Sequence, residues 1–147
     1  MRLVVDTTVL VAELLRAIGR ERLYDERLDV FLPEQMWEQV HVELPRRVDA
    51  FARKRSLAPD LAEELKSACS AAMEANVDLV DLPVYSALED EARSRSLRDP
   101  NDWPLVACAL ALAAAIWTND NGLLGTGVPT WTTQTLQAWL DRNPGSE

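Results

Sequence analysis

Five carboxylate residues stand out because each follows a short apolar segment or lies beside one: Asp6, Glu38, Asp99, Asp102 and Asp120. In a parallel α/β sheet such positions gather at the carboxyl ends of the strands, where ligands bind. Carboxylates that lie close together in a partly buried site repel one another, and this destabilises the fold unless a cation is bound. Hard oxygen ligands favour Mg²⁺ or Mn²⁺. These residues therefore indicate metal-assisted hydrolysis of a phosphodiester.

The densest of these segments runs from Arg98 to Leu124 and reads RDPNDWPLVACALALAAAIWTNDNGLL. Two carboxylates precede the apolar run 105–115, whose alanine and leucine content favours a helix buried on all sides. Residues 116–118 are typical of a short strand, and Asp120 follows them. A helix that feeds a strand packs antiparallel to it, so its start and the end of the strand share one sheet edge. We therefore expect Asp102 to meet Asp120 in space.

The other elements follow from apolar patterning. Short apolar runs predict strands at 3–5, 30–32, 79–82, 116–118 and 130–132. Helices are expected at 9–18, ended by Gly19, at 33–44, at 46–55 after an interruption by Pro45, and at 60–75, 84–96, 105–115 and 133–140. Thr7 and Thr8 are candidates to cap the first helix, which leaves Asp6 free. The alternation predicts a three-layer α/β/α fold around a central, mainly parallel sheet of four to five short strands.

Length and composition narrow the possible functions. The 147 residues fit one domain spanning the chain, and no run reaches the roughly 18 apolar residues of a membrane span. Cys69 and Cys108 both lie in alanine-rich segments, which indicates two reduced, buried thiols in a cytoplasmic protein. The phosphate-cradling patterns GxGxxG and GxxxxGK[ST] are absent, which argues against a nucleotide cofactor.

The overall charge says little about a binding partner, whereas one local cluster of charge is informative. The net charge of −9 argues against simple field-driven attraction to nucleic acid. One basic cluster nevertheless stands against this background, with Asp49 as its sole acidic neighbour: Arg46, Arg47, Arg53, Lys54 and Arg55. This cluster is either a solvated helix face or a contact surface for phosphates or an acidic partner.

Four segments together resemble the PIN-domain ribonucleases: VVDTTVL at 4–10, LPEQMWEQV at 32–40, RDPNDWPLVACALAL at 98–112 and IWTNDNGLLGTGVPTWTT at 116–133. The last two are most similar to a branch of small prokaryotic PIN domains. The segments cover less than half of the chain, but their order and spacing span nearly all of it. The resemblance implies a metal-dependent endoribonuclease that uses Mg²⁺ or Mn²⁺, often the toxin of a type II toxin–antitoxin pair of the VapC kind.

The resemblance also implies roles for individual residues. Metal ligands are implied at Asp6, Asp99, Asp102 and Asp120, and the catalytic set would comprise Asp6, Glu38, Asp102 and Asp120. Thr8 matches a polar residue that hydrogen-bonds within the family's site, and Asn121 is a second supporting candidate. Glu34 and Glu43 lie close enough to Glu38 to take its place, so this assignment stays open.

A reaction and partners follow from the same resemblance. It implies in-line attack of a metal-bound water on RNA, leaving a 5′-phosphate and a 3′-hydroxyl. The partners would be a cognate antitoxin and a second copy of the chain, contacted through the helices between Pro45 and Pro83. The basic cluster would then be the surface for RNA or the antitoxin.

Two other classes of function use similar residues. One is a catalytically silent binding module that keeps the fold. The other is an aspartyl-phosphate receiver or phosphatase, in which Asp81 would be the acceptor of a receiver. A phosphatase of this class needs Asp-x-Asp after the first strand, where this chain has Thr8, and a receiver needs a late lysine, whereas no lysine follows Lys66.

Overall fold

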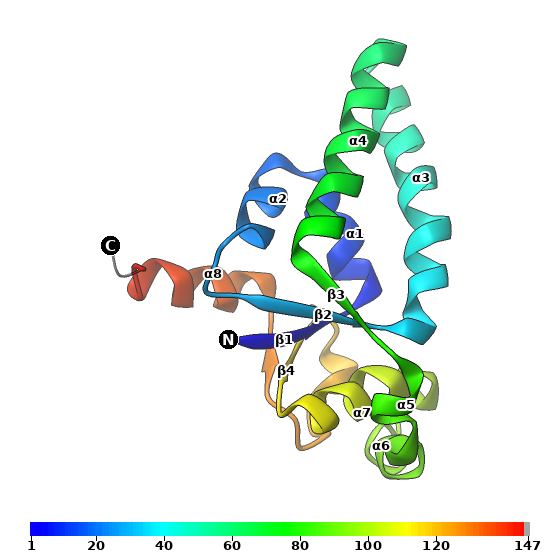
Figure 1. Ribbon diagram of the computed structural model, residues 1–147, viewed down its shortest axis with the longest axis vertical. Helices are drawn as coiled ribbons and strands as arrows, with labels where there is room; N and C mark the ends of the chain where they lie inside the picture. Colours follow the sequence, from blue (N-terminus) through cyan, green and yellow to red (C-terminus); the bar gives the residue numbers. More distant parts are fainter. Residues whose placement is uncertain (146–147) are drawn as a thin grey trace.

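A parallel sheet of five strands forms the middle layer of the fold, in the order β3-β2-β1-β4-β5 (Figure 1). The computed structural model describes residues 1–145. The strands are β1 (Arg2–Val5), β2 (Asp29–Pro33), β3 (Val77–Val80), β4 (Ala115–Trp117) and β5 (Thr130–Trp131). Leu3, Val4 and Val5 of the central strand are 0% exposed, because helices cover both faces of the sheet. The predicted three-layer α/β/α fold is thereby confirmed.

The helices divide between the two faces of the sheet (Figure 1). One face is covered by α1 (Thr7–Leu15), α2 (Ala17–Leu23), α3 (Trp37–Lys54) and α4 (Pro59–Asn76). The opposite face is covered by α5 (Leu82–Tyr85), α6 (Glu89–Arg95) and α7 (Trp103–Leu112). The closing helix α8 (Thr133–Arg142) starts with a capping box between Thr132 and Thr135. Short 3-10 turns join several elements: η1 (Glu34–Met36), η2 (Ser86–Leu88), η3 (Pro100–Asp102) and η4 (Asn121–Leu123).

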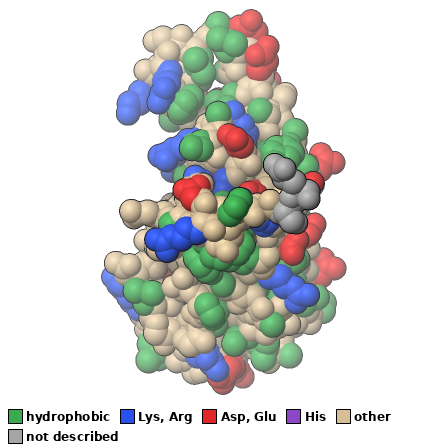
Figure 2. Space-filling view, turned by 90° about the vertical axis from the view of Figure 1, so that its left-hand side faces the viewer, with side chains coloured by type: hydrophobic (Ala, Val, Ile, Leu, Met, Phe, Trp, Pro, Cys, Tyr) green, Lys and Arg blue, Asp and Glu red, His purple; other side chains and the backbone are tan. Residues whose placement is uncertain are grey.

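Helices α3 and α4 form an antiparallel hairpin that projects beyond the sheet and makes the narrow end of the molecule (Figures 1 and 2). The predicted break at Pro45 is wrong, because Pro45 lies inside the continuous helix α3. Val40 and Val48, on either side of the proline, are both buried. Their packing carries the helix through a residue that removes one backbone hydrogen bond.

Gly19 does not end the first helix as predicted. Helix α1 ends at Leu15, Arg16 is extended, and Gly19 lies inside the second helix α2. A Cβ atom at this position would overlap the backbone of Glu13, because α2 packs directly against the end of α1. Glycine is therefore required here for close packing of two helices and not for helix termination.

The Gly19→Ala variant is expected to lose about 1–3 kcal/mol of unfolding free energy, as overpacked sites do. The added methyl group meets backbone atoms, which cannot swing aside as a side chain would. Urea denaturation of the two proteins measures the loss. Gly145→Ala is the matched control, because a Cβ atom at that position meets nothing within 4 Å. Equal midpoints for Gly19→Ala and the control would contradict the tight helix contact.

Three further boundaries differ from the predictions. Strand β3 begins two residues earlier than expected and pairs with β2 from Val77 to Val80. The segment predicted as one helix at 84–96 is divided into α5, η2 and α6. Helix α7 ends where Ala113 takes a left-handed conformation with φ of 51°, which releases the chain into β4. Within residues 1–145, every helix is too short or too polar to cross a membrane.

Candidate active site

A cleft of about 780 Å³ opens at the carboxyl ends of β1 and β4. Its lining includes six acidic residues: Asp6, Glu38, Glu43, Asp99, Asp102 and Asp120. Helices α1 and α3 supply one wall, and η3 together with the turn after β4 supplies the other. All five carboxylates chosen from the sequence therefore line one cleft, including Asp102 and Asp120, which are far apart along the chain.

A buried threonine ties two of the acidic residues together. The Thr118 hydroxyl donates to Asp6 Oδ2 at 2.9 Å and accepts the Asp120 backbone N–H at 3.0 Å. The Asp6 backbone N–H donates to the Trp117 carbonyl at 2.9 Å, which continues the pairing of β1 with β4. Thr118 is 2% exposed, so this link is shielded from water. Thr118 is not among the predicted site residues, although a threonine two residues before an aspartate at the end of an apolar strand is a known turn signal.

Asp6 occupies the N-cap position of α1, but its side chain makes no capping hydrogen bond. Thr7 and Thr8 are the first helical residues rather than caps, which corrects the predicted capping. Burial raises the pKa of the Asp6 carboxyl above its usual value, the Thr118 hydrogen bond opposes this rise, and nearby Asp120 adds to it. The Asp6 carboxylate is thus free to act in the cleft, and like-charged neighbours act on it.

Asp102 is the most perturbed of the acids. Its pKa is raised to about 6, first by burial and then by repulsion from Asp99, Asp6 and Asp120. Asp99 and Asp120 each place one carboxylate oxygen in a local turn: Asp99 accepts the Asn101 backbone N–H at 3.0 Å, and Asp120 accepts the Gly122 backbone N–H at 2.8 Å. These turns hold both side chains in the cleft. Because each acid raises the pKa of Asp102, the cleft concentrates negative charge.

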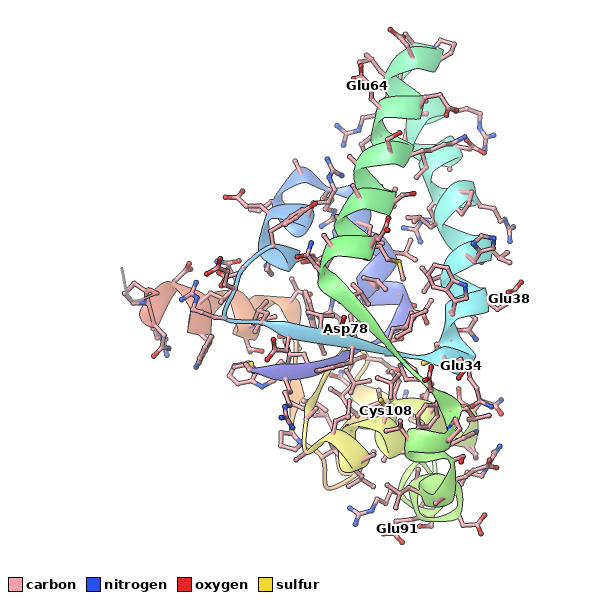
Figure 3. All side chains as sticks on the ribbon, viewed as in Figure 1. Glu34, Glu38, Glu64, Asp78, Glu91 and Cys108 are labelled. Atoms are coloured by element: carbon pink, nitrogen blue, oxygen red, sulfur yellow. The ribbon has the colours of Figure 1, made fainter. Side chains whose placement is uncertain are left out.

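The three candidate glutamates take different positions. The Glu34 carboxylate accepts the Leu82 backbone N–H at 2.6 Å, at the start of α5, and does not line the cleft. Figure 3 shows Glu34 at the junction with α5 and Glu38 projecting from the first turns of α3. Glu38 and Glu43 both line the cleft, five residues apart on α3. The structure therefore separates Glu34 from the cleft and leaves Glu38 and Glu43 in it.

The remaining predicted site residues also separate. Thr8 lines the cleft, whereas Asn121, in η4, does not. Of the basic cluster, Arg47 reaches the cleft wall. Gln39 and Asn101, which are not among the predicted site residues, also line the cleft. Gln39 Oε1 accepts a 3.3 Å hydrogen bond from the hydroxyl of Thr7.

The donor set suits a hard divalent cation, because the cleft offers carboxylate oxygens and neither cysteine lines it. Cys69 and Cys108 are free and buried, and burial raises the pKa of the Cys108 thiol to about 12, which rules out a thiolate nucleophile there. Among the residues that the structure describes, no three acidic, histidine or cysteine side chains are grouped tightly enough to enclose an ion. The acids thus form an open, mutually repelling set.

Comparison with known proteins places this arrangement in a family. The family model described as "PIN domain" matches residues 4–141. The fold is similar to VapBC2 from Rickettsia felis bound to a DNA fragment from their promoter, with a TM-score of 0.57, 15% identity, and coverage of 90% of this chain and 98% of that one. It is also similar to FitAB bound to the IR36 DNA fragment, with a TM-score of 0.53, 20% identity, and coverage of 88% and 94%.

FitAcB from Neisseria gonorrhoeae is a third similar structure, with a TM-score of 0.51, 20% identity, and coverage of 88% of this chain and 96% of that one. At these identities the likeness is one of fold. No curated protein matches the sequence significantly. The family model nevertheless spans nearly the whole sequence, including all the acids of the cleft. This chain therefore belongs to the PIN-domain family.

Proposed function

We propose that this protein is a metal-dependent endoribonuclease that hydrolyses RNA phosphodiesters in the acidic cleft. The observation that carries the proposal is the convergence of four aspartates, from three separate parts of the chain, in one cleft. There burial and the other three aspartates raise the pKa of Asp102. Such a concentration of charge destabilises the fold and is typical of sites that bind cations. Membership of the PIN-domain family, whose members are generally nucleases that use divalent metal ions, supports it.

The proposed roles follow from position. Asp6, Asp99, Asp102 and Asp120 would hold Mg²⁺ or Mn²⁺, and Glu38 would accept a proton from the attacking water. A bound divalent ion supplies stabilisation of negative charge on the phosphodiester and of the deprotonated nucleophile. Thr118 orients Asp6 and Asp120 through its two hydrogen bonds. Thr8 lines the cleft and would support the site from its wall. Asn121 would support the site from the turn next to Asp120.

We further propose that the whole chain acts as one PIN domain, works as a homodimer in the cytoplasm and is the toxin of a type II toxin–antitoxin pair. The similarity of fold to VapBC2 and FitAB supports this, together with the resemblance of two sequence segments to small prokaryotic PIN domains. The aspartyl-phosphate alternative loses its main candidate, because Asp81 lies at the N-terminal boundary of α5 and does not line the cleft.

Cleavage of a mixed single-stranded RNA pool tests the proposal. With Mg²⁺ or Mn²⁺, wild type is expected to release products with 5′-phosphates, and EDTA is expected to abolish this. Asp102→Asn is expected to reduce the rate about 100- to 1,000-fold, the effect of losing several kcal/mol of charge stabilisation. Asp78→Asn, an exposed site on β3, is the matched control and should cut like wild type. Cleavage that survives both EDTA and Asp102→Asn would come from a contaminant, whereas no cleavage of any RNA would favour the silent module.

Thr118→Val is expected to weaken Mn²⁺ binding about 10- to 100-fold, the range measured when a group that orients metal ligands is lost. Valine keeps the shape of threonine but removes the donor to Asp6 and the acceptor for the Asp120 backbone. Calorimetric titration with Mn²⁺ measures the affinity. Thr130→Val, at a half-buried position in β5, is the control. Equal Mn²⁺ affinity for wild type and Thr118→Val would show that the link does not orient the ligands.

A further inference from the structure

Helix α3 has two different sides. Trp37, Val40, His41 and Leu44 line an apolar hollow of about 530 Å³ between α3 and α4. The other side, called here the polar face of α3, is made of six residues that line the acidic cleft or a neighbouring hollow of about 440 Å³: Gln39, Glu43, Arg46, Arg47, Ala50 and Arg53. Glu38, Val42 and Asp49 line the same spaces at the edges of this face. Glu43 and Arg47 line both spaces, so the cleft continues directly onto this face.

The polar face is long enough to guide a chain molecule. At a rise of 1.5 Å per residue, the helix covers about 21 Å between Gln39 and Arg53. Figure 1 shows α3 running from the sheet edge, where the cleft lies, to the tip of the projecting hairpin. A ligand bound along this face would therefore enter the acidic cleft from the end of α3 that carries Glu38.

The free charge on this face is positive. Glu43 lies 3.6 Å from Arg46, and Asp49 lies 3.2 Å from Lys66 of α4, so both nearby acids have basic partners. Arg47 and Arg53 are exposed, and neither has an acidic partner within 4.0 Å among residues 1–145. Two guanidinium groups without carboxylate partners are thus presented beside a cleft of opposite charge.

A third arginine, Arg98, lies close to the opposite wall but outside the lining of the cleft. The Arg98 side chain packs over Gly122, with its Cδ atom 3.3 Å from the place a Cβ atom of that glycine would take. The Gly122 backbone in turn donates to Asp120, so Arg98 lies next to the acids. Arg98 is exposed and has no ion-pair partner in the described part of the chain. Positive charge therefore flanks the cleft on both sides.

We infer that a single strand of RNA lies along the polar face of α3 with phosphates on Arg53 and Arg47, crosses the acidic cleft, and leaves past Arg98. This inference rests on the proposed ribonuclease function. A chain with a net charge of −9 repels RNA, and four aspartates at the cutting site add to this repulsion. Phosphate contacts on both sides of the cleft offset it, and guanidinium groups make strong bidentate hydrogen bonds to phosphates.

The chemistry of the path also indicates what it recognises. Its residues offer charge and hydrogen bonds to a phosphate backbone, and none of them is an aromatic side chain on which bases could stack. Arg55, from the same basic cluster, instead stacks on Phe51 at 4.6 Å. The path therefore contributes affinity for RNA that depends on the salt concentration and hardly on the base sequence. A single helix face offers one row of phosphate contacts, which matches a single strand of RNA.

Binding of a labelled 12-nucleotide mixed-sequence RNA, followed by fluorescence anisotropy from 50 to 200 mM salt, tests the path. All proteins carry Asp102→Asn, so that the RNA stays intact in Mg²⁺. Adding Arg47→Gln and Arg53→Gln is expected to lower the slope of log affinity against log salt by about 1.4, or 0.7 for each phosphate contact on a single strand. The affinity at 0.1 M salt then falls about 10- to 25-fold. Arg98→Gln alone is expected to lower the slope by about 0.7.

Arg16→Gln with Arg142→Gln is the matched control, because both arginines are exposed and line neither the cleft nor the neighbouring hollow. Their replacement removes the same charge as the α3 variant. Loss of slope in the control equal to that in the α3 variant would reduce the effect to net charge and overturn the path. Unchanged RNA binding by the α3 variant, with an altered particle mass by light scattering, would identify the face as a protein interface and also overturn it. If wild type cuts no RNA but the α3 variant loses slope, the path stands and the nuclease proposal fails. If wild type cuts RNA but the α3 variant keeps its slope, the nuclease proposal stands and the path fails.

Discussion

Metal-free Asp102→Asn is expected to unfold at a higher temperature than wild type at pH 7.5. Burial and three neighbouring aspartates raise the pKa of Asp102 to about 6, so the ionised form is held against repulsion in the folded state. A rise from 3.8 to about 6 corresponds to at most about 3 kcal/mol, and solvent screening of this partly exposed group reduces that to about 1–2 kcal/mol. Asparagine removes the charge, and the melting temperature should rise by about 3–6 °C.

The pH dependence of this difference has a definite sign. Because the pKa of Asp102 is higher in the folded than in the unfolded chain, the folded protein binds more protons between about pH 4 and pH 6. The stabilisation from the protonated group is complete below the unfolded pKa and is lost as the pH rises through 6. The advantage of Asp102→Asn is therefore largest above pH 7 and shrinks toward zero near pH 4. Thermal unfolding from pH 4 to 8 measures it.

Metal should reverse the order of the two proteins. A cation present at 100 times its dissociation constant adds about 2.7 kcal/mol to any protein that binds it only when folded. Mn²⁺ is thus expected to raise the melting temperature of wild type above that of Asp102→Asn, which has lost a ligand. Asp78→Asn controls for the loss of one negative charge and should follow wild type in both conditions. A variant that melts below wild type without metal would show that the acids do not repel one another as described.

The strands that helices bury on both faces could be predicted closely from sequence. Strands β1 and β4 read as unbroken apolar runs because helices cover both sides of the sheet, and their positions were predicted to within one residue. Strand β3 lies at the sheet edge, where Val77 and Val80 are buried but Asp78 and Leu79 are exposed. The buried residues of β3 are set by its position at the edge of the sheet and do not form a regular apolar pattern. The predicted boundaries of β3 were therefore two residues off.

Side-chain and helix packing accounts for two of the other errors. Local sequence predicts a helix end at Gly19 because it carries no sign that α2 packs against the backbone of Glu13. It predicts a break at Pro45 because proline by itself opposes a helix, whereas Val40 and Val48 are held by packing on either side. In both cases tertiary packing overrides a correct local preference.

The acidic site could be predicted from sequence only in part. The aspartates could be chosen because each lies at the boundary of a strand or helix, and parallel topology brings such boundaries together. The choice among Glu34, Glu38 and Glu43 could not be closed from sequence, because the turn η1 sets the direction in which α3 begins. Glu34, in that turn, meets the start of α5, whereas Glu38 and Glu43 line the cleft. The link through Thr118 depends on the register of β1 with β4, which no local pattern displays.

A buried ion pair, which the sequence pattern does not predict, joins the three helices α1, α2 and α8. Glu13 of α1 is 5% exposed and pairs with Arg22 of α2, whose Nε atom donates to Gln137 Oε1 of α8 at 2.9 Å. Both side chains of the pair are more than nine-tenths buried. A buried pair of this kind contributes little relative to an apolar pair of the same volume, but removing one partner leaves an isolated charge in the interior.

Glu13→Ala is therefore expected to lose about 3–5 kcal/mol of unfolding free energy, with a melting temperature about 10 °C lower. Arg22 would be left buried with the neutral side chain of Gln137 as its remaining partner. Urea denaturation of wild type, Glu13→Ala, Arg22→Met and the double variant Glu13→Leu with Arg22→Met completes a mutant cycle. The double variant should return to within about 1 kcal/mol of wild type, because it removes both charges and fills the space. A double variant as unstable as Glu13→Ala would show instead that α1, α2 and α8 depend on the ion pair itself to hold their packing.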